Sequence, residues 1–300
     1  MANGSQPDEQ PVYSFCRGYK TEQQMTPSKP DLRPIGIFDS GVGGLSVLRA
    51  VRELIPNEDL LYLADQAHVP YGSRTLAEVR RFSEGITRYL LEQNAKLVVV
   101  ACNTASAAAL HHLRAVFPQI PFVGMEPAVK PAAETTRSGV VGVLATPATF
   151  QGELYASVIE RFAVGVRVMQ GICPGLVMEI DQENLDTPEV YSILEKALKP
   201  MLVDGIDTVV LGCTHFPFVI PVIETIVGPG VRVIDPSPAI ARQVQRLLEA
   251  KGLLNKSLDQ GRIEYFTTGD KDQLGDLLPC LMGSPGDVKA LSWNQERLGK

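Results

Sequence analysis

The chain has 300 residues, of which 45% are hydrophobic and 21% charged, a composition typical of a globular enzyme with one large or two ordinary domains. Its formal net charge of −6 argues against a surface that follows nucleic-acid phosphates, so we expect no direct nucleic-acid partner. No apolar run reaches the roughly 18 residues that span a bilayer, and the N-terminus lacks the layout of a signal peptide, so no membrane association is expected.

The N-terminal segment and the cysteines indicate where the folded body begins and in which compartment it works. Residues 1–33 are polar and interrupted by several prolines, so we expect this extension to be disordered. Five cysteines without regular spacing do not indicate a disulfide framework, and a cytoplasmic protein with free thiols is expected. Cys16 falls in the extension, and Cys280 is expected in the core.

From residue 34 onward the chain repeats itself. Four short apolar runs, each typical of a buried strand, recur in the same order about 105 residues later. The pairs are Ile35–Asp39 with Val141–Ala145, Leu60–Ala64 with Val166–Met169, Val98–Cys102 with Val209–Cys213, and Ile120–Gly124 with Val231–Ile234. Internal duplication of a unit with four strands is the simplest interpretation.

Helical patterns separate these strands. They cover Gly44–Leu54, Leu76–Glu92, Ser106–Val116, Pro188–Val203 and Pro238–Leu248. Strands that alternate with helices indicate parallel sheets covered on both faces. We therefore predict an α/β fold made of two similar, doubly wound α/β domains with mainly parallel sheets. The two domains are related by the duplication, and we expect the active site in the cleft between them.

Two cysteines occupy matching positions in the two halves. Cys102 lies in VVVACNTAS and Cys213 in VVLGCTHFP, each directly after a β-branched apolar run. Each thiol therefore falls at the carboxyl end of a predicted strand, where open α/β sheets bind ligands. One thiol from each half suggests a small substrate held between two sulfurs. This arrangement suits chemistry in which a proton leaves one face of a carbon and returns to the other.

Other interpretations of these cysteines are weaker. A single cysteine after a strand is usually a buried small hydrophobic residue, but polar residues directly follow both Cys102 and Cys213. A metal site could use both thiols and His215, yet no CxxC pair or HxxxH is present and a closed zinc site takes four ligands, so no metal is expected. A disulfide between the two is not expected in a reducing compartment.

Two turns carry further candidate residues. The segment Asp39–Gly44 ends a predicted strand and begins a predicted helix. It matches neither GxGxxG nor a P-loop, so a nucleotide phosphate is not the expected ligand. The Asp39 carboxylate is expected either to bind an ammonium group or to cap the helix. Pro70-Tyr71-Gly72 is a turn that could present a backbone N–H and a phenol to a carboxylate. His215 is the histidine adjacent to a candidate thiol, whereas His68 is expected in an exposed loop and His111 and His112 on a helix.

Six motifs carry a family resemblance. They are FDSGVGGLSVL (Phe38–Leu48), DxxxxPYG (Asp65–Gly72), VVACNTAS (Val99–Ser106), GVLATPAT (Gly142–Thr149), LGCTHFP (Leu211–Pro217) and FTTGD (Phe266–Asp270). In their order and spacing, over about residues 34–285, they resemble the glutamate racemases of the cofactor-independent aspartate/glutamate racemase family. The resemblance implies interconversion of L- and D-glutamate without pyridoxal phosphate, metal or nucleotide, in support of peptidoglycan biosynthesis.

The resemblance also implies roles for individual residues. Cys102 matches the cysteine that deprotonates D-glutamate and Cys213 the one that deprotonates L-glutamate, with Asp39 and His215 as auxiliary acid/base residues. A further glutamate of the family aligns loosely with Asp181, with Glu179 as the alternative. The positions that match substrate contacts are Asp39, Ser40, Pro70, Tyr71, Gly72, Asn103, Thr104, Thr146, Thr214 and His215.

Domain boundaries and partners follow from the same resemblance. The first domain takes residues 34–129 and 239–286, the second 130–238, and 287–300 form a C-terminal tail. A homodimer is expected, and the long N-terminal extension resembles members activated by UDP-N-acetylmuramoyl-L-alanine, some of which inhibit DNA gyrase. The alternatives are a racemase for aspartate or another small acidic amino acid, and a gyrase-binding regulator that keeps the fold without the activity.

Overall fold

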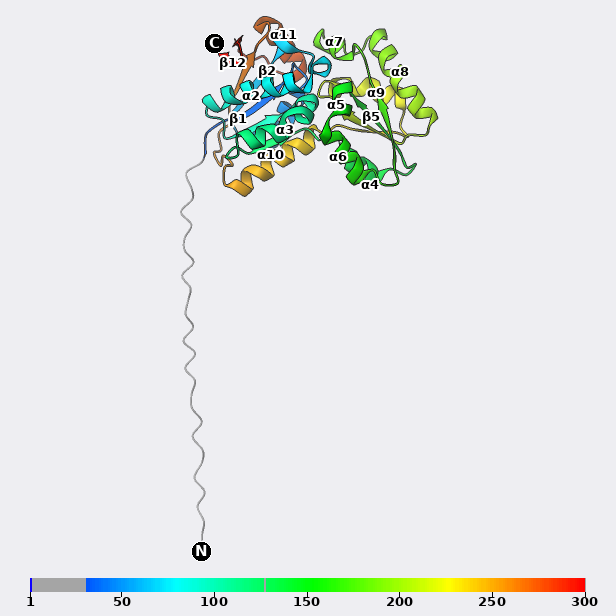
Figure 1. Ribbon diagram of the computed structural model, residues 1–300, viewed down its shortest axis with the longest axis horizontal. Helices are drawn as coiled ribbons and strands as arrows, with labels where there is room; N and C mark the ends of the chain where they lie inside the picture. The colour runs from blue at the N-terminus through cyan, green and yellow to red at the C-terminus, as the bar shows by residue number, and fades with distance from the viewer. Residues whose placement is uncertain (2–30, 127, 300) are drawn as a thin grey trace.

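The computed structural model describes residues 1, 31–126 and 128–299. The predicted disorder of residues 1–33 and the position of Cys16 concern a segment that lies, apart from its ends, outside the described residues. Figure 1 shows two lobes side by side, the first carrying β1 and the C-terminal elements and the second carrying β5 and helices α4 to α9.

The first lobe is built on a parallel sheet of six strands. Its order is β10-β9-β2-β1-β3-β4, and every neighbouring pair is parallel. The strands are β1 (Ile35–Asp39), β2 (Leu60–Ala64), β3 (Leu97–Val100), β4 (Phe122–Gly124), β9 (Ile263–Thr267) and β10 (Val288–Ala290). The strands β1, β2 and β3 are completely buried, as expected for strands in a sheet with both faces covered.

The second lobe repeats the first four strands in the same spatial order. Its parallel sheet has the order β6-β5-β7-β8, which corresponds strand for strand to β2-β1-β3-β4. The strands are β5 (Val140–Ala145), β6 (Arg167–Gly171), β7 (Thr208–Gly212) and β8 (Arg232–Ile234). The predicted α/β class, the parallel sheets and the duplication are therefore confirmed.

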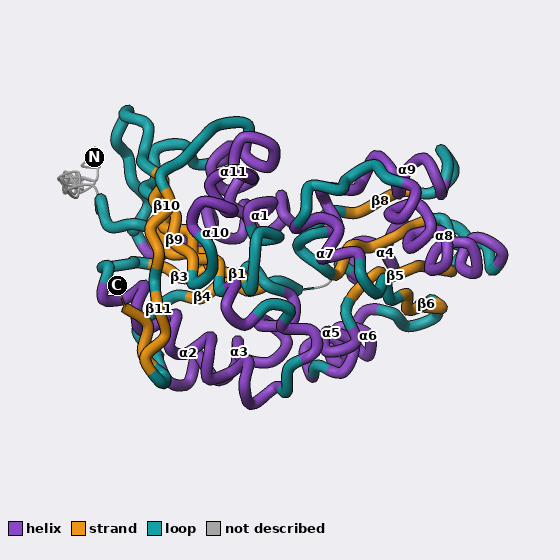
Figure 2. The backbone as a smooth tube through the Cα atoms, turned by 90° about the horizontal axis from the view of Figure 1, so that it is seen from above, coloured by secondary structure: helices purple, strands orange, loops and turns teal. Residues whose placement is uncertain are grey.

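Helices cover both faces of each sheet. In the first lobe α1 (Leu45–Leu54), α10 (Ser237–Lys251) and α11 (Lys271–Met282) pack on one face, and α2 (Leu76–Glu92) and α3 (Asn103–Val116) on the other. In the second lobe α7 (Leu176–Asp181), α8 (Pro188–Val203) and α9 (Ile220–Val227) cover one face, and α4 (Val129–Thr135) and α6 (Glu153–Phe162) the other. Figure 2 shows the two layered lobes from above, with the short α5 (Pro147–Gln151) between them.

The chain passes twice between the lobes. It leaves the first sheet after β4 and enters the second with α4 and β5. After β8 it returns to the first lobe, where α10 packs against α1 and β9 pairs with β2. Among the described residues, no helix is both long and apolar enough to cross a membrane.

Three features of the secondary structure differ from the sequence expectations. The first sheet gains β9 and β10, and β10 lies within residues 287–300, which were expected to form a tail. A hairpin of β11 (Ser292–Asn294) and β12 (Arg297–Gly299) follows and packs on α2. Helix α3 begins at Asn103 rather than Ser106, because the Cys102 side chain accepts the N–H of Ala105 as an N-cap.

The expected core position of Cys280 is wrong. Cys280 lies on α11, whose buried stripe consists of Leu274, Leu277, Leu278 and Leu281, and its thiol is exposed outside this stripe. The neighbouring leucines at helical spacing already supply the apolar face that the sheet needs, so the thiol is not required there.

Candidate active site

The predicted site residues meet at the carboxyl ends of β1, β3, β5 and β7. They surround a small cavity of about 30 Å³ between the lobes. Its lining consists of Ser40, Val69, Pro70, Tyr71, Gly72, Cys102, Asn103, Thr104, Thr146, Val177, Gly212, Cys213, Thr214 and His215. Both thiols are in this lining, one from each lobe, as the duplication predicts.

Cys102 sits at the N-terminus of α3. Its Sγ accepts the N–H of Ala105 at 3.4 Å and lies 3.8 Å from Oγ of Ser40. Burial raises the pKa of the Cys102 thiol well above its ordinary value, the Asp39 carboxylate adds to the rise, and the two hydrogen bonds oppose it. In this closed arrangement Cys102 is therefore a protonated thiol at neutral pH.

Cys213 lies beside a charged histidine. Its Sγ is 3.9 Å from Nδ1 of His215, whose Nε2 is 3.1 Å from Oδ1 of Asp181. Burial alone lowers the pKa of His215, but the hydrogen bonds to Asp181 and Cys213 raise it, and the net pKa lies well above the ordinary value. Cys213 lies beside a histidine and Cys102 beside a hydroxyl and a carboxylate, so the two thiols have unequal surroundings.

Asp39 connects the two halves of the site. Its Oδ1 accepts the hydroxyl of Ser40 and the N–H of Gly41, both at 3.0 Å, and its Oδ2 accepts the hydroxyl of Thr214 at 2.7 Å. The Asp39 side chain is fully buried. Because Thr214 belongs to the second lobe, this hydrogen bond holds the lobes together beside the cavity.

Gly43 permits the close approach of the second lobe. A Cβ at this position would lie 2.5 Å from Oγ1 of Thr214, a distance that real Cβ atoms do not show, and it would also collide with the His215 ring. The hydroxyl of Ser46 donates to the backbone carbonyl of Thr214 at 3.1 Å. The glycine-rich turn after β1 therefore allows the segment that carries Cys213 to pack closely against the first lobe.

A second set of polar groups in the cavity lining is arranged to accept a ligand. The hydroxyl of Thr104 lies 3.1 Å from that of Thr146 and 3.3 Å from that of Thr149, which joins the lobes a second time. Asn103 is 4% exposed, and within the described residues neither its amide nitrogen nor its amide oxygen has a hydrogen-bond partner. A buried amide without partners is costly, so this side chain is a strong candidate to bind substrate.

The turn at Pro70-Tyr71-Gly72 differs from the expectation in one respect. It lines the cavity, but the Tyr71 hydroxyl donates to Oδ2 of Asp65 at 2.6 Å and is therefore not free to donate to a ligand carboxylate. A Cβ on Gly72 would lie 3.1 Å from Cβ of Thr146, so this turn contacts the second lobe closely. The backbone, rather than the phenol, is the group this turn can offer to a substrate.

The remaining candidate acidic residues and histidines differ in whether they reach the cavity. Asp181 contacts His215, whereas Glu179 accepts a hydrogen bond from the Asn184 side chain at 2.9 Å. His68, expected in an exposed loop, is instead partly buried and stacks on Phe82 with ring centroids 3.8 Å apart. His111 and His112 lie on α3, away from the cavity lining.

Sequence reasoning missed Thr149, Val69 and Val177. Thr149 lies three residues after the N-cap Thr146, a spacing that signals a hydroxyl near the start of a helix. The two valines gave no signal, since only the tertiary fold brings them to the cavity.

A wider opening adjoins this small cavity. It has a volume of about 280 Å³ and shares Pro70, Gly72, Thr146 and Val177 with the cavity lining. Cys173 lies at this opening and not in the cavity, and burial raises the pKa of its thiol to about 12.

In the described part of the chain, no group of three or more His, Cys, Asp or Glu residues could hold a metal ion.

Comparisons with known proteins agree with this architecture. Residues 36–244 match the family model of Asp/Glu/hydantoin racemases. A curated glutamate racemase of Roseiflexus sp. (strain RS-1) is 52% identical over 259 residues, which cover 84% of this chain and 95% of that protein. The fold and the two-lobed cavity thus define a racemase.

Solved structures lead to the same family. The chain is similar to the glutamate racemase isoform RacE1 of Bacillus anthracis, with a TM-score of 0.82, 30% identity and coverage of 89% of this chain and 99% of that chain. It is also similar to the Escherichia coli glutamate racemase in complex with L-glutamate and the activator UDP-MurNAc-ala, with a TM-score of 0.75, 35% identity and coverage of 86% and 97%. The chain belongs to the glutamate racemase family, whose members are isomerases.

The raised pKa of His215 makes a prediction for stability. A group whose folded pKa is raised contributes stability that is complete below its unfolded pKa of about 6.5 and is lost as the pH rises through the folded pKa. The free energy of unfolding of the wild type should therefore fall toward that of His215→Asn as the pH rises from 6.5, by at most about 1.4 kcal/mol per pH unit. Urea denaturation between pH 6 and 9 measures this difference.

A matched control is His111→Asn, since His111 is exposed on α3. This variant should follow the wild type at every pH. A difference between wild type and His215→Asn that stays constant or grows with pH would contradict the proposed charge state of His215.

Proposed function

We propose that this enzyme interconverts L- and D-glutamate by moving a proton at Cα between two thiols, Cys102 and Cys213. The observation that supports it best is that corresponding strands of the two lobes each deliver one thiol to the same small cavity. A racemase needs a base on one face of the carbon and an acid on the other, and the duplication supplies a group from each side.

The unequal surroundings of the thiols support a direction for the first step. Cys213, beside the His215 imidazolium, is the base that takes the Cα proton of L-glutamate and leaves the electron pair on Cα. Cys102, a protonated thiol here, returns a proton to the opposite face and becomes the thiolate. The conversion of D-glutamate runs in reverse. Asp39 and the His215–Asp181 pair act as the auxiliary acid/base groups beside each sulfur.

The polar lining supports a dicarboxylic amino acid as substrate. Asn103, Thr104, Thr146 and Thr214 offer amide and hydroxyl groups, and the turn at Tyr71-Gly72 offers its backbone N–H groups to a carboxylate. Ser40 and Asp39 lie beside Cys102, where Asp39 can meet the substrate ammonium group once its bond to Thr214 is released.

The cavity volume requires the lobes to separate before binding. A cavity of about 30 Å³ has room for one or two water molecules, less than a molecule of glutamate needs. The hydrogen bonds from Thr214 to Asp39 and from Thr104 to Thr146 must therefore open to admit the substrate. Closure around the substrate then expels water and orients Cα between the thiols.

The primary test is exchange at Cα in D₂O. Purified full-length protein with L-glutamate and a chelator, and with no cofactor added, should lose optical activity and the Cα proton signal together. Deuterium uptake is expected because the returning proton comes from a thiol in equilibrium with solvent. Exchange with aspartate but not with glutamate would support the same mechanism and contradict glutamate as the substrate. If neither amino acid exchanges its Cα proton, even with the peptidoglycan precursor added, the proposed activity is contradicted. The alternative of a gyrase-binding regulator with the same fold would then be favoured.

Serine substitutions test the two thiols separately. Cys102→Ser and Cys213→Ser should each fold normally and lose about 10²- to 10⁴-fold in racemisation, the usual contribution of a positioned acid or base. Initial rates in both directions, with thermal melting as the folding check, measure this loss. Cys280→Ser, which changes an exposed thiol on α11, should keep the wild-type rate. A near wild-type rate in either active-site variant would contradict the two-base mechanism.

We further propose that the enzyme supplies D-glutamate for peptidoglycan in the reducing cytoplasm, and that UDP-N-acetylmuramoyl-L-alanine activates it. The free thiols of the described residues favour a reducing compartment. The similar Escherichia coli structure, which holds such an activator, supports the second part. At a glutamate concentration below KM, the precursor should raise the initial rate of full-length protein by about 5- to 150-fold, the usual range of allosteric coupling in affinity, whereas UDP alone should not. Equal rates with and without the precursor would contradict activation.

A further inference from the structure

Two sequence motifs outside the thiol chemistry meet at one buried carboxylate. Asp65, directly after β2, is fully buried and opens the DxxxxPYG motif. Its Oδ2 accepts the Tyr71 hydroxyl at 2.6 Å and lies 2.9 Å from Nδ1 of His68. Its Oδ1 accepts the hydroxyl of Thr268, from the FTTGD motif, at 2.8 Å and the indole N–H of Trp293 at 2.8 Å. Four side chains thus surround one buried charge, two from the same motif and two from more than 200 residues away in the sequence.

Trp293 brings the C-terminal hairpin to this network. It lies on β11, and its indole ring packs edge-on against His68 and tilted against Phe82, with ring centroids 5.3 and 6.1 Å apart. The Trp293 side chain therefore contacts the network in two ways, through its N–H to Asp65 and through its ring to His68. The hairpin is joined to the turn that lines the substrate cavity.

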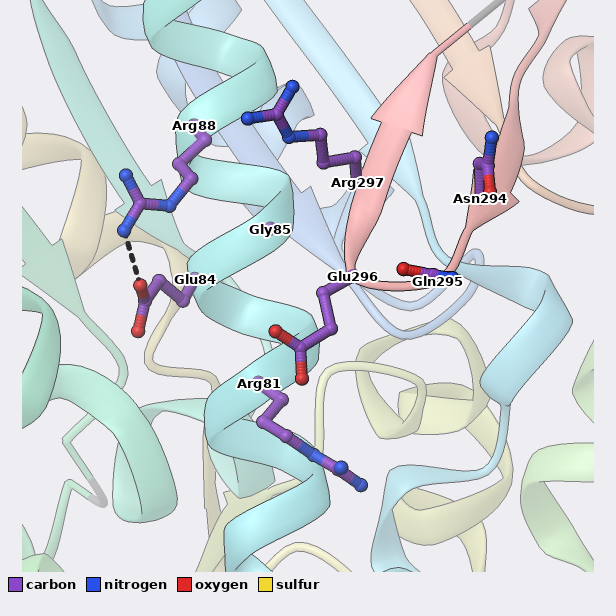
Figure 3. Close-up of a pocket in the computed structure, with 8 residues that line it drawn as sticks. All are labelled: Arg81, Glu84, Gly85, Arg88, Asn294, Gln295, Glu296 and Arg297. Atoms are coloured by element: carbon purple, nitrogen blue, oxygen red, sulfur yellow. Dashed lines mark hydrogen bonds and ion pairs between the residues drawn. The ribbon is translucent and has the colours of Figure 1, made fainter.

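Gly85 makes room for the hairpin on α2. A Cβ at Gly85 would lie 2.7 Å from the Trp293 ring and 2.8 Å from the carbonyl oxygen of Glu296. Figure 3 shows Gly85 on α2 beside the hairpin, at the edge of a surface pocket of about 700 Å³. A glycine inside a helix costs roughly 0.5–1 kcal/mol relative to alanine, so close docking of the hairpin offsets a real local penalty.

The network determines where Tyr71 can be. Burial, followed by the charge and hydrogen bond of Asp65, raises the pKa of Tyr71 well above its ordinary value, so the phenol remains a donor to Asp65. A buried carboxylate that loses a donor is left undersatisfied, and its remaining partners must shift to compensate. Tyr71 is the partner that lies in the cavity lining, so such a shift reaches the substrate.

We propose that Asp65 and Trp293 are positioning residues that hold the Tyr71-Gly72 turn in place for substrate binding. This inference rests on the proposed racemisation of glutamate. Neither residue lines the cavity, and both act through Tyr71. Because the turn offers backbone groups to a substrate carboxylate and not to the reacting carbon, its displacement weakens binding of both enantiomers more than it slows proton transfer.

The first experiment compares Trp293→Phe with wild type. Phenylalanine keeps an aromatic ring at this position and removes the donor to Asp65. The KM for L- and D-glutamate should rise about tenfold, the effect of about 1.4 kcal/mol in binding, while kcat changes less than twofold. Asn294→Ala, an exposed position on the same strand, should leave both constants unchanged. Tyr71→Phe combined with Trp293→Phe should raise KM by a factor other than the product of the single effects, since both donors act on one carboxylate.

A second experiment uses intrinsic fluorescence, because Trp293 is the one tryptophan of the chain. Gly85→Ala should displace the hairpin, shift the Trp293 emission to longer wavelength and raise KM as Trp293→Phe does. A red-shifted Gly85→Ala with wild-type KM would overturn the inference and leave the hairpin a purely structural element. Unchanged emission in Gly85→Ala would contradict the docking geometry.

The outcomes separate this inference from the proposed function. A wild type that does not racemise glutamate contradicts the function and removes the basis of the inference. An active wild type together with an unchanged KM in Trp293→Phe contradicts the inference alone. Loss of kcat without a rise in KM would show that the network supports the chemistry and not the binding turn, and would also overturn it.

Discussion

The hydrogen bond from Thr214 to Asp39 is the contact on which the rest of the site depends. It joins a residue that follows β7 in the second lobe to a fully buried carboxylate at the end of β1 in the first. This bond joins the lobes beside the cavity of about 30 Å³, together with the bonds of Ser46 and Thr104 to the second lobe, and Asp39 places a negative charge near Cys102. The absence of a side chain at Gly43 allows the bond to form, since a Cβ there would displace Thr214.

Duplication supplied two equivalent thiols, and the surroundings then made them unequal. Both follow the third strand of their lobe, but Cys102 caps α3, whereas Cys213 precedes a turn and a short 3-10 helix at Phe216–Val219. The first thiol is buried beside a carboxylate, and the second lies beside an imidazolium held by Asp181. A reaction that needs one acid and one base at the same time benefits from this asymmetry, because two identical thiols would both be protonated or both be charged.

The sequence predicted those parts of the fold that local patterns determine. The buried β-branched runs, their repetition and the alternating helices were sufficient to predict two parallel sheets, and the thiols at the strand ends to predict the cavity. The strands β9 and β10 were not predicted because they have no counterpart in the second lobe, so the repeat gave no signal for them. The partners of Asp65 could not be predicted either, since Thr268 and Trp293 lie more than 200 residues away in the sequence.

The near absence of free space between the thiols has a kinetic meaning. Under the proposed opening of the lobes, a ligand binds only to the fraction of molecules whose lobes are apart. The apparent dissociation constant is then the intrinsic one divided by that fraction. Association is then slower than the collision rate, and the hydrogen bonds that hold the lobes together lower the apparent affinity for a ligand while they exclude water from the cavity. Substrate capture in this protein is therefore a competition between glutamate and the protein's own hydrogen bonds for the same polar side chains.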